Sequence, residues 1–273
     1  MVSSTRTPLL QLHGVSKRFG AVQALSDVDF EVYRGEVVGL VGDNGAGKST
    51  LIKCIAGIHP IDAGEIRFEG RTVNIGSPKA AAALGIETVY QDLALCDNLD
   101  VVGNLFLGRE RTNRIVPRVV EPIDEVSMEK RAIDVLRGLS VAIPSVRLVI
   151  ASLSGGQRQS VAVARAVMWN SKVVILDEPT AALGVAQSRQ VLDLICRLRD
   201  QGLGVVVISH NLADIFEVVD RIIVLRLGRR VATFDVHSTS REQVVGAITG
   251  AEFGTAEDLT EPKGLSEAER GAQ

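Results

Sequence analysis

The chain has 273 residues, with 30 basic and 33 acidic side chains, a formal net charge of −3 and 46% hydrophobic residues. The near-neutral balance disfavours a nucleic-acid-binding protein, which normally carries a basic surplus. Its aliphatic runs are far shorter than the roughly 20 residues of a membrane-spanning helix, and its first residues lack the apolar core of a secretory signal, so we expect a cytoplasmic protein without membrane spans.

The order of apolar and polar residues predicts strands and helices that alternate along most of the chain. Three runs near the N-terminus are typical of β-strands and indicate a β-rich layer, and the alternation begins after residue 42. The elements expected as far as residue 90 are strands at 9–15, 28–33 and 36–41, a helix at 47–56, a hairpin at 66–73, a helix at 78–84 and a strand at 88–90.

Residues 92–153 differ from their surroundings, because their apolar residues have helical spacing and their connectors are polar and contain proline. We interpret them as a helical insertion. The alternation then resumes with a helix at 154–168, a strand at 173–176, a helix at 185–199, a strand at 205–209, a helix at 212–218 and a strand at 221–225. Such alternation predicts an α/β fold with a parallel sheet.

A glycine-rich segment lies between the strand expected at 36–41 and the helix that follows. Positions 42–50, Gly-Asp-Asn-Gly-Ala-Gly-Lys-Ser-Thr, match the P-loop pattern in the strand–loop–helix context that it requires. Glycines let backbone N–H groups surround phosphate oxygens, and the helix N-terminus adds a partial positive charge. We predict that Lys48 reaches the β- and γ-phosphates of ATP and that Ser49 ligates Mg²⁺. The predicted nucleotide-binding residues of the loop are Gly42, Asp43, Asn44, Gly45, Ala46, Gly47, Lys48, Ser49 and Thr50.

Two adjacent carboxylates end the apolar strand expected at 173–176. In open α/β sheets, ligands bind at the carboxyl ends of the strands. We predict that Asp177 holds Mg²⁺ and that Glu178, which points elsewhere because side chains alternate along a strand, accepts a proton from the attacking water.

A second anion-binding helix start is predicted at Leu-Ser-Gly-Gly-Gln, positions 153–157, where Ser154 stands at a helix-capping position. Together with the P-loop and the carboxylate strand, this motif resembles the signature of the ATP-binding subunits of ABC transporters. The resemblance covers residues 8–250 and implies a P-loop NTPase (RecA-like) α/β core with an N-terminal antiparallel β layer and a helical insertion subdomain.

The resemblance also implies roles for residues outside these motifs. Phe19 would stack on adenine, His210 would be a catalytic residue at the γ-phosphate, and Gln91 would contact Mg²⁺ and the catalytic water. Two chains would pack head to tail, so that the signature of one faces the ATP held by the other. The signature residues expected to act in trans are Ser154, Gly155, Gly156 and Gln157.

The implied domain organisation has three parts. Residues 1–91 and 154–250 would form the ATP-binding core with its β subdomain. Residues 92–153 would form a helical subdomain that docks a transmembrane permease, through exposed apolar surface near positions 93–99. Residues 251–273 carry six acidic and two basic side chains and are expected to form a disordered acidic tail.

The segments 88–99 and 181–184 look like the branch of the family that imports simple sugars such as ribose, xylose and fructose. In that setting the chain would hydrolyse ATP at the cytoplasmic face of the cell membrane, as a peripheral subunit beside a permease and an extracellular sugar-binding protein. Only one P-loop and one signature are present, so two copies would associate. One position departs from the family: Gly184 stands where an aspartate is usual, which puts the contacts of that aspartate across the dimer in doubt.

Three other functions are weighed against sugar import. An ABC importer or exporter ATPase for another substrate would have the same motifs, because the cassette does not touch the cargo. A soluble ABC ATPase acting on ribosomes or DNA would generally carry tandem cassettes, a basic surface or a long coiled-coil arm, none of which the sequence indicates. A P-loop kinase or GTPase is disfavoured by the signature motif and by the segment around His210.

Overall fold

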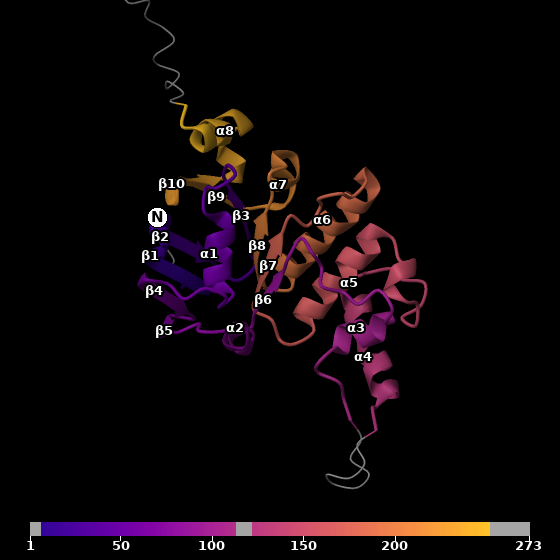
Figure 1. Cartoon of the computed structure of the whole chain (residues 1–273). Coiled ribbons are helices and arrows are strands. Elements are labelled where there is room, and N and C mark those ends of the chain that lie inside the picture. Colours follow the sequence, from indigo (N-terminus) through magenta and orange to yellow (C-terminus); the bar gives the residue numbers. More distant parts are fainter. Residues whose placement is uncertain (1–6, 113–121, 252–273) are drawn as a thin grey trace, which may run out of the picture.

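A computed structural model describes residues 7–112 and 122–251 of the protein. Its N-terminal part contains a four-stranded sheet in the order β2-β1-β4-β5, whose neighbouring strands are all antiparallel (Figure 1). The strands are β1 (Leu10–Phe19), β2 (Val22–Val32), β4 (Ala63–Phe68) and β5 (Arg71–Val73). This sheet is the N-terminal antiparallel layer that the family resemblance implies.

The centre of the molecule is a six-stranded sheet in the order β10-β9-β3-β8-β7-β6. Five of its strands are parallel, and β10 joins the edge in the antiparallel direction. The strands are β3 (Glu36–Val41), β6 (Ile86–Val89), β7 (Val173–Asp177), β8 (Gly204–Ile208), β9 (Arg221–Arg226) and β10 (Arg229–Asp235). The predicted α/β fold with a parallel core sheet is thus confirmed.

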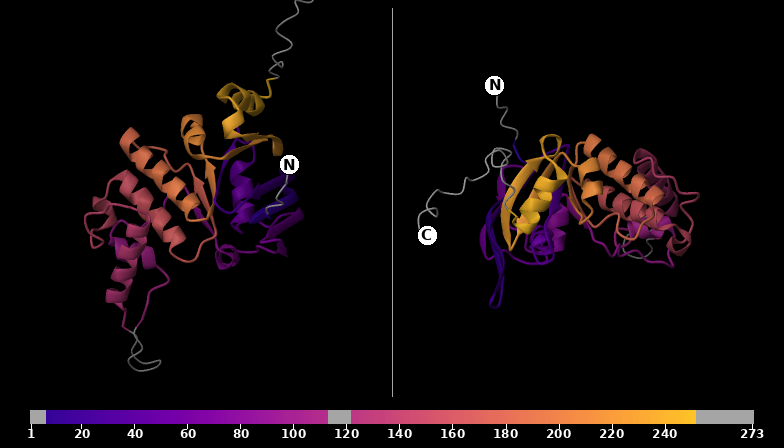
Figure 2. Two further views of the ribbon diagram at one scale, coloured as in Figure 1. Left: turned by 180° about the vertical axis from the view of Figure 1, so that it is seen from behind. Right: turned by 90° about the horizontal axis from the view of Figure 1, so that it is seen from above.

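Both faces of the core sheet are covered, which explains the almost continuous apolar composition of its strands. Val38 and Leu40 of β3 lie in a hydrophobic cluster with α1, α2 and the N-terminal sheet, whereas Val37 and Val41 lie in a second cluster with the remaining helices. Seen from above, the N-terminal sheet and the pair α5–α6 lie at opposite sides of the molecule (Figure 2).

Eight α-helices are present in the described ranges, and none of these helices has the length and apolarity needed to cross a membrane. Helices α1 (Lys48–Ile55) and α2 (Pro78–Leu84) cover the face of the core sheet that also packs against the N-terminal sheet. The others are α3 (Val101–Phe106), α4 (Glu125–Gly138), α5 (Gly155–Val167), α6 (Val185–Asp200), α7 (Leu212–Val218) and α8 (Arg241–Thr249).

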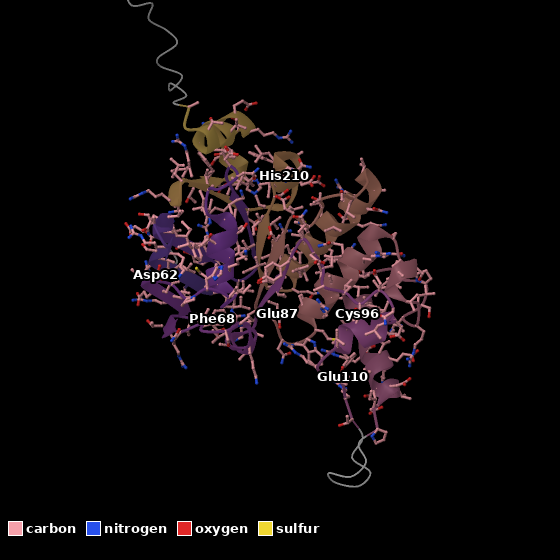
Figure 3. The ribbon with its side chains drawn as sticks, viewed as in Figure 1. Asp62, Phe68, Glu87, Cys96, Glu110 and His210 are labelled. Carbon is pink, nitrogen blue, oxygen red and sulfur yellow. The ribbon has the colours of Figure 1, made fainter. Side chains whose placement is uncertain are left out.

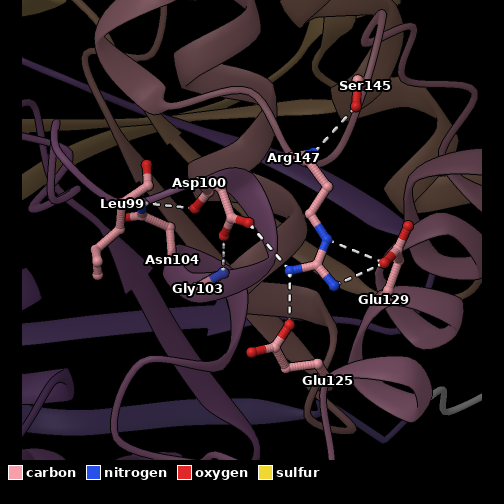
Figure 4. Close-up of polar contacts among 8 residues, drawn as sticks. All are labelled: Leu99, Asp100, Gly103, Asn104, Glu125, Glu129, Ser145 and Arg147. Carbon is pink, nitrogen blue, oxygen red and sulfur yellow. Dashed lines mark hydrogen bonds and ion pairs between the residues drawn. The ribbon is translucent and has the colours of Figure 1, made fainter.

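The segment expected to be a helical insertion contains α3, α4 and the short helix η1 (Ile150–Ser152). One arginine joins its parts, as Figure 4 shows. The Arg147 guanidinium donates to Glu129 Oε2 through Nε at 3.0 Å and Nη2 at 2.7 Å, and its Nη1 lies 3.3 Å from Glu125 Oε2 and 3.4 Å from Asp100 Oδ2. Because Asp100 also caps α3 by accepting from Gly103 N at 2.7 Å, this cluster connects the starts of α3 and α4 to the segment before η1.

The structure differs from the expected elements mainly at exposed positions. Strand β2 begins six residues before the predicted start at residue 28, because it pairs with β1 in a hairpin up to the Phe19–Val22 pair. Strand β10 and helix α8 were not predicted. Most residues of β10 are exposed, and α8 buries only Val244 and Gly246, so neither has the apolar pattern from which elements are predicted. The expected acidic tail lies outside the described residues, apart from Ala251.

Candidate nucleotide-binding site

The parallel strands bring the predicted site residues to one edge of the core sheet. Strands β3, β8, β7 and β6 are consecutive neighbours, and their register aligns Leu40 with Ile208, Ile208 with Asp177, and Leu176 with Val89. The P-loop, His210, Glu178 and Gln91 each follow the carboxyl end of one of these strands. Segments more than a hundred residues apart in the sequence therefore meet at this edge.

The P-loop has backbone geometry that only glycine accommodates at two positions. A Cβ atom on Gly42 would lie 2.2 Å from the carbonyl oxygen of Leu225, and one on Gly47, which has φ of 102°, would lie 2.8 Å from that of Ala24. The Lys48 ammonium folds over the loop and donates to the carbonyl oxygens of Gly42 at 2.7 Å and Asp43 at 3.0 Å. The loop is therefore a compact turn, and the Lys48 ammonium lies against the backbone carbonyls at its start.

A groove along the P-loop is bordered by residues that the sequence analysis did not identify. The turn between β9 and β10 contributes Leu227 and Gly228, and Gly228 N donates to Ala46 O at 3.0 Å. The lining residues are Val22, Gln23, Ala24, Asn44, Gly45, Ala46, Gly47, Lys48, Ser49, Thr50, Leu227 and Gly228. The only signal for this turn in the sequence is a Leu-Gly pair, which is too common to indicate a site.

The electrostatics of the edge connect the loop to the carboxylates. Partial burial lowers the pKa of Lys48, and the nearby charges of Glu178, Asp43 and Asp177 oppose this shift. Burial, followed by repulsion from Glu178, raises the pKa of Asp177, and Lys48 and Lys53 counteract it. Both shifts arise first from burial, which disfavours the charged form of each group, and perturbed pKa values of this kind cluster at functional sites.

Glu178 is held firmly by the residues that follow β8. Its Oε1 accepts from the backbone N of His210 at 3.1 Å, and its Oε2 lies 2.9 Å from His210 Nδ1. The Ser209 hydroxyl donates to the same Oε2 at 3.4 Å. Glu178 also has φ of 50°, a left-handed conformation that costs about 1–2 kcal/mol for a residue with a Cβ and is typical of functional sites.

His210 is the most exposed member of this group, since 79% of its side chain is accessible, against 16% for Glu178. Figure 3 shows His210 at the end of the core sheet near α7, whereas Glu87 on β6 lies toward the opposite end. Gln91, two residues past β6, is exposed at the same edge as His210. The three residues predicted to be catalytic therefore follow neighbouring strands at one edge of the sheet, and Glu178 and His210 are in direct contact.

The signature segment lies away from the P-loop of the same chain. Ser154 caps α5 by accepting from Gln157 N at 3.3 Å, and the Gln157 side chain accepts from Ser154 N at 3.0 Å, which completes a capping box. Ser154 and Gly155 are exposed. Since α1 and α5 cover opposite faces of the core sheet, the two helix starts predicted to bind anions do not face each other within one chain.

Phe19 lies at the corner of the β1–β2 hairpin and is 43% exposed. It is not among the residues that line the groove along the P-loop, but it belongs to the same hairpin as Val22 and Ala24, which do. An exposed aromatic ring on the hairpin that borders the P-loop groove is suited to stacking on a base.

The oxygen ligands expected for Mg²⁺ are available at the edge. Ser49 is exposed at the start of α1, and the partly buried Asp177 carboxylate is close enough to influence the pKa of Lys48. Hydroxyl and carboxylate oxygens are the ligands that Mg²⁺ prefers, with water completing its coordination. No group of three or more His, Cys, Asp or Glu side chains within 7–112 and 122–251 is arranged to hold a metal.

Comparisons with known proteins agree with this geometry. The sequence profile of the family described as "ABC transporter" matches residues 25–181. The chain is 48% identical over 246 residues to the fructose import ATP-binding protein FrcA of Rhizobium meliloti, in a match that covers 89% of this chain and 95% of that protein. It is 46% identical to the xylose/arabinose import ATP-binding protein XylG of Sulfolobus acidocaldarius, covering 90% of this chain and 96% of that protein.

Other relatives are about twice as long. The ribose import ATP-binding protein RbsA of Caldanaerobacter subterraneus is 39% identical over 90% of this chain, but the match covers only 48% of that protein. Among solved structures, a dimeric post-hydrolysis ATP-binding cassette bound to ADP and Pi is similar with a TM-score of 0.69 and 25% identity, over 84% of this chain and all of that one.

Proposed function

Because the chain belongs to the ATP-binding proteins of ABC transporters, we propose that it hydrolyses ATP to energise the import of a simple sugar. The observation that carries the proposal is the near full-length match to two single-cassette sugar-import proteins, at 48% and 46% identity. The edge of the core sheet, where the P-loop faces Glu178, supplies the chemistry that such a function requires.

ATP binding is attributed to the P-loop and Phe19. The backbone N–H groups of residues 42–50 and the Lys48 ammonium are suited to the phosphates, and the exposed Phe19 ring is suited to the base. We propose that Ser49, Asp177 and Gln91 hold Mg²⁺, directly or through water. When bound, this ion neutralises charge that develops on the phosphate oxygens.

Hydrolysis is attributed to Glu178 as the general base. A carboxylate within reach of the attacking water accepts its proton while the bond to the γ-phosphate breaks. The backbone N of His210 and the Ser209 hydroxyl hold Glu178 by hydrogen bonds and so fix the direction of its free lone pairs. His210 and Gln91, exposed on either side of Glu178, would orient the γ-phosphate and the water.

A homodimer would complete the site. The signature residues Ser154, Gly155, Gly156 and Gln157 lie on the other face of the core sheet from α1, so a second chain must supply them to the ATP held by the first. A similar cassette is dimeric in a post-hydrolysis state with ADP and Pi bound, which supports this proposal. Gly184, which replaces the usual aspartate, is the N-cap residue before α6, and a Cβ atom at this position would meet nothing within 4 Å. Any contact that Gly184 makes with a partner is through its backbone.

The permease would dock on the side of residues 92–153, which we propose to be a separate helical subdomain. The expected apolar surface at 93–99 is wrong in detail: Leu93 and Leu95 are half-buried and pack against the core. A groove beside them is lined by Tyr90, Leu107, Arg109 and Trp169 among others, and Leu107 is 46% exposed. This groove is our candidate contact with permease subunits, which would place the chain peripherally at the cytoplasmic face of the membrane, with an extracellular sugar-binding protein on the other side.

The test separates hydrolysis from binding and from transport. In the purified protein, Glu178→Gln should lower the ATPase rate by about 10²–10⁴-fold while the dissociation constant for ATP stays within about 3-fold of the wild type, since the amide keeps the shape of the side chain. Glu242→Gln, on the exposed surface of α8, is the matched control and should leave both unchanged.

The same two variants are then introduced into cells that carry the intact transporter, and uptake of labelled fructose, xylose and ribose is measured. Loss of uptake of at least one of these sugars with Glu178→Gln, but not with Glu242→Gln, is the expected result. Near-wild-type ATP turnover in the Glu178 variant would contradict its role as the base. Unchanged uptake of all three sugars despite lost turnover would contradict import of this class of sugar.

A further inference from the structure

The exposed ring of Phe19 has a neighbour that the sequence analysis left without a function. The His59 imidazole lies with its centroid 5.0 Å from that of Phe19, and the two ring planes are nearly perpendicular, at 74°. This is the edge-to-face geometry that aromatic pairs favour. His59 is half-buried, whereas Phe19 keeps 43% of its surface exposed.

A third group also contacts the Phe19 ring. Lys17 Nζ lies 5.5 Å from the ring centroid, within the range of a cation–π contact. Lys17 is itself only 8% exposed and donates to Asp62 Oδ1 at 2.7 Å, while Asp62 Oδ2 accepts from the backbone N of Arg18 at 2.6 Å. Asp62, labelled in Figure 3, thus fixes the strand end that carries Phe19.

His59 lies beside the Phe19 ring because it follows the end of α1, the helix that begins at the P-loop. Helix α1 starts at Lys48 and ends at Ile55, and the backbone N atoms of Ile58 and His59 both donate to Lys53 O, at 2.8 Å and 3.2 Å. One short helix therefore presents the phosphate-binding residues at its start and a partner of Phe19 just beyond its end.

We propose that His59 is a positioning residue for the adenine of ATP: it holds the Phe19 ring in the orientation in which the exposed part of the ring stacks on the base. The inference rests on the proposed function, because it takes ATP as the ligand of the P-loop. Without His59 the ring is free to change rotamer and must lose this freedom on binding, so the affinity for the base falls while the phosphate contacts remain.

The experiment compares a ligand that has a base with one that has only phosphates. His59→Ala should raise the dissociation constant for MgATP, and its KM, by roughly 2- to 10-fold, the size of one aromatic pair, with kcat unchanged. Binding of inorganic tripolyphosphate should be unaffected. His59→Phe should restore the affinity for MgATP, because a phenyl ring offers the same contact.

Two further variants locate the effect. His237→Ala, an exposed histidine in the short helix η2 (Val236–Ser238), is the matched control and should behave as wild type. In a Phe19→Ala background, His59→Ala should cause no additional loss, because its partner is gone.

Three results would overturn the proposal: unchanged MgATP affinity in His59→Ala, an equal loss for tripolyphosphate, or fully additive losses in the double variant. An equal loss would mean that His59 acts on the P-loop through α1. A wild-type chain that binds MgATP but does not hydrolyse it would contradict the proposed function alone, since the comparison of the two ligands still decides the role of His59.

Discussion

The P-loop and the segment 93–100 both follow a strand of the core sheet, yet they are held in different ways. The P-loop is fixed by its own residues and by backbone contacts: Lys48 donates to the carbonyls of Gly42 and Asp43, and Gly228 N donates to Ala46 O. The segment 93–100 is fixed by side chains that reach it from two helices. The side-chain contacts that hold the P-loop come from within its own nine residues, whereas those that hold the segment 93–100 come from outside it.

The side chains that hold the segment 93–100 come from α3 and α5. Asn104, which is fully buried, accepts from Cys96 N at 2.7 Å and donates to the carbonyl oxygens of Cys96, Leu99 and Asp100. Arg165, on the same helix as the signature, donates to Leu93 O at 3.1 Å and Ala94 O at 2.9 Å. The segment that follows Gln91 is therefore tied to the signature helix, whereas the P-loop is tied to the β9–β10 turn.

The largest effect in this comparison is expected on ATP affinity when the positive charge of Lys48 is removed from the P-loop. Lys48→Ala should weaken ATP binding by about 10²–10³-fold, or about 3–4 kcal/mol, because it removes charge-assisted hydrogen bonds to the phosphates. Equilibrium titration with ATP measures this. Lys130→Ala, an exposed lysine on α4, is the control. Unchanged ATP affinity in the Lys48 variant would mean that the P-loop is not the nucleotide site.

A smaller effect, on stability instead of ligand affinity, is expected in the second region. Asn104→Ala should lower the free energy of unfolding by about 1–3 kcal/mol, because it leaves the N–H of Cys96 without its buried acceptor. The carbonyl oxygens of Cys96, Leu99 and Asp100 lose the Asn104 amide but keep their backbone donors. ATP affinity should change little in the fraction that remains folded.

Urea denaturation followed by tryptophan fluorescence measures this change. The single tryptophan of the chain, Trp169, packs against Phe106 of α3, with 5.5 Å between the two ring centroids. Its fluorescence therefore reports on the region that Asn104 holds in place. Asn98→Ala, at an exposed position of the same segment, is the control and should shift stability by less than about 0.5 kcal/mol. Equal destabilisation by both variants would show that Asn104 has no special part in holding the segment.

The same contrast explains how much the sequence could predict. The core strands, the P-loop and the pair Asp177–Glu178 were predicted because each depends on consecutive residues with a direct physical reason, such as glycine where a backbone turns tightly. Their convergence at one edge followed from the parallel sheet, since the carboxyl ends of parallel strands meet. The functional roles assigned to these residues remain proposals.

What could not be predicted depends on contacts between residues that do not belong to one continuous motif. Nothing in the sequence near Phe19 indicates that His59 lies beside it, and nothing near Cys96 indicates that a buried asparagine holds its backbone. Strand β10 and helix α8 were missed for a related reason: they are mostly exposed, and tertiary contacts, such as the pairing of β10 with β9, define them more than an apolar pattern does.

The smallest effect is expected at the Arg147 cluster, although it has the largest number of ion pairs around one side chain in the described part of the chain. The hydrogen bonds that Arg147 donates to Glu129 are the largest cause that raises the pKa of Arg147, and the charges of Glu129 and Asp100 add to this. However, 41% of its side chain is exposed and so is 67% of that of Glu125. Water and salt therefore screen the attraction, and such pairs contribute only about 0–1 kcal/mol.

Arg147→Ala should consequently lower the free energy of unfolding by about 0–1 kcal/mol at low ionic strength, and the difference from wild type should shrink further at 1 M salt, where the screening length is only about 3 Å. Denaturation curves at both salt concentrations measure it, with Arg147→Lys as a variant that keeps the charge. A loss above about 2 kcal/mol that persists at high salt would show that the guanidinium holds α3 and α4 together by geometry and not by charge. In that case the helical region would depend on Arg147 as it does on Asn104, and the contrast with the P-loop would be sharper than the exposure of the cluster implies.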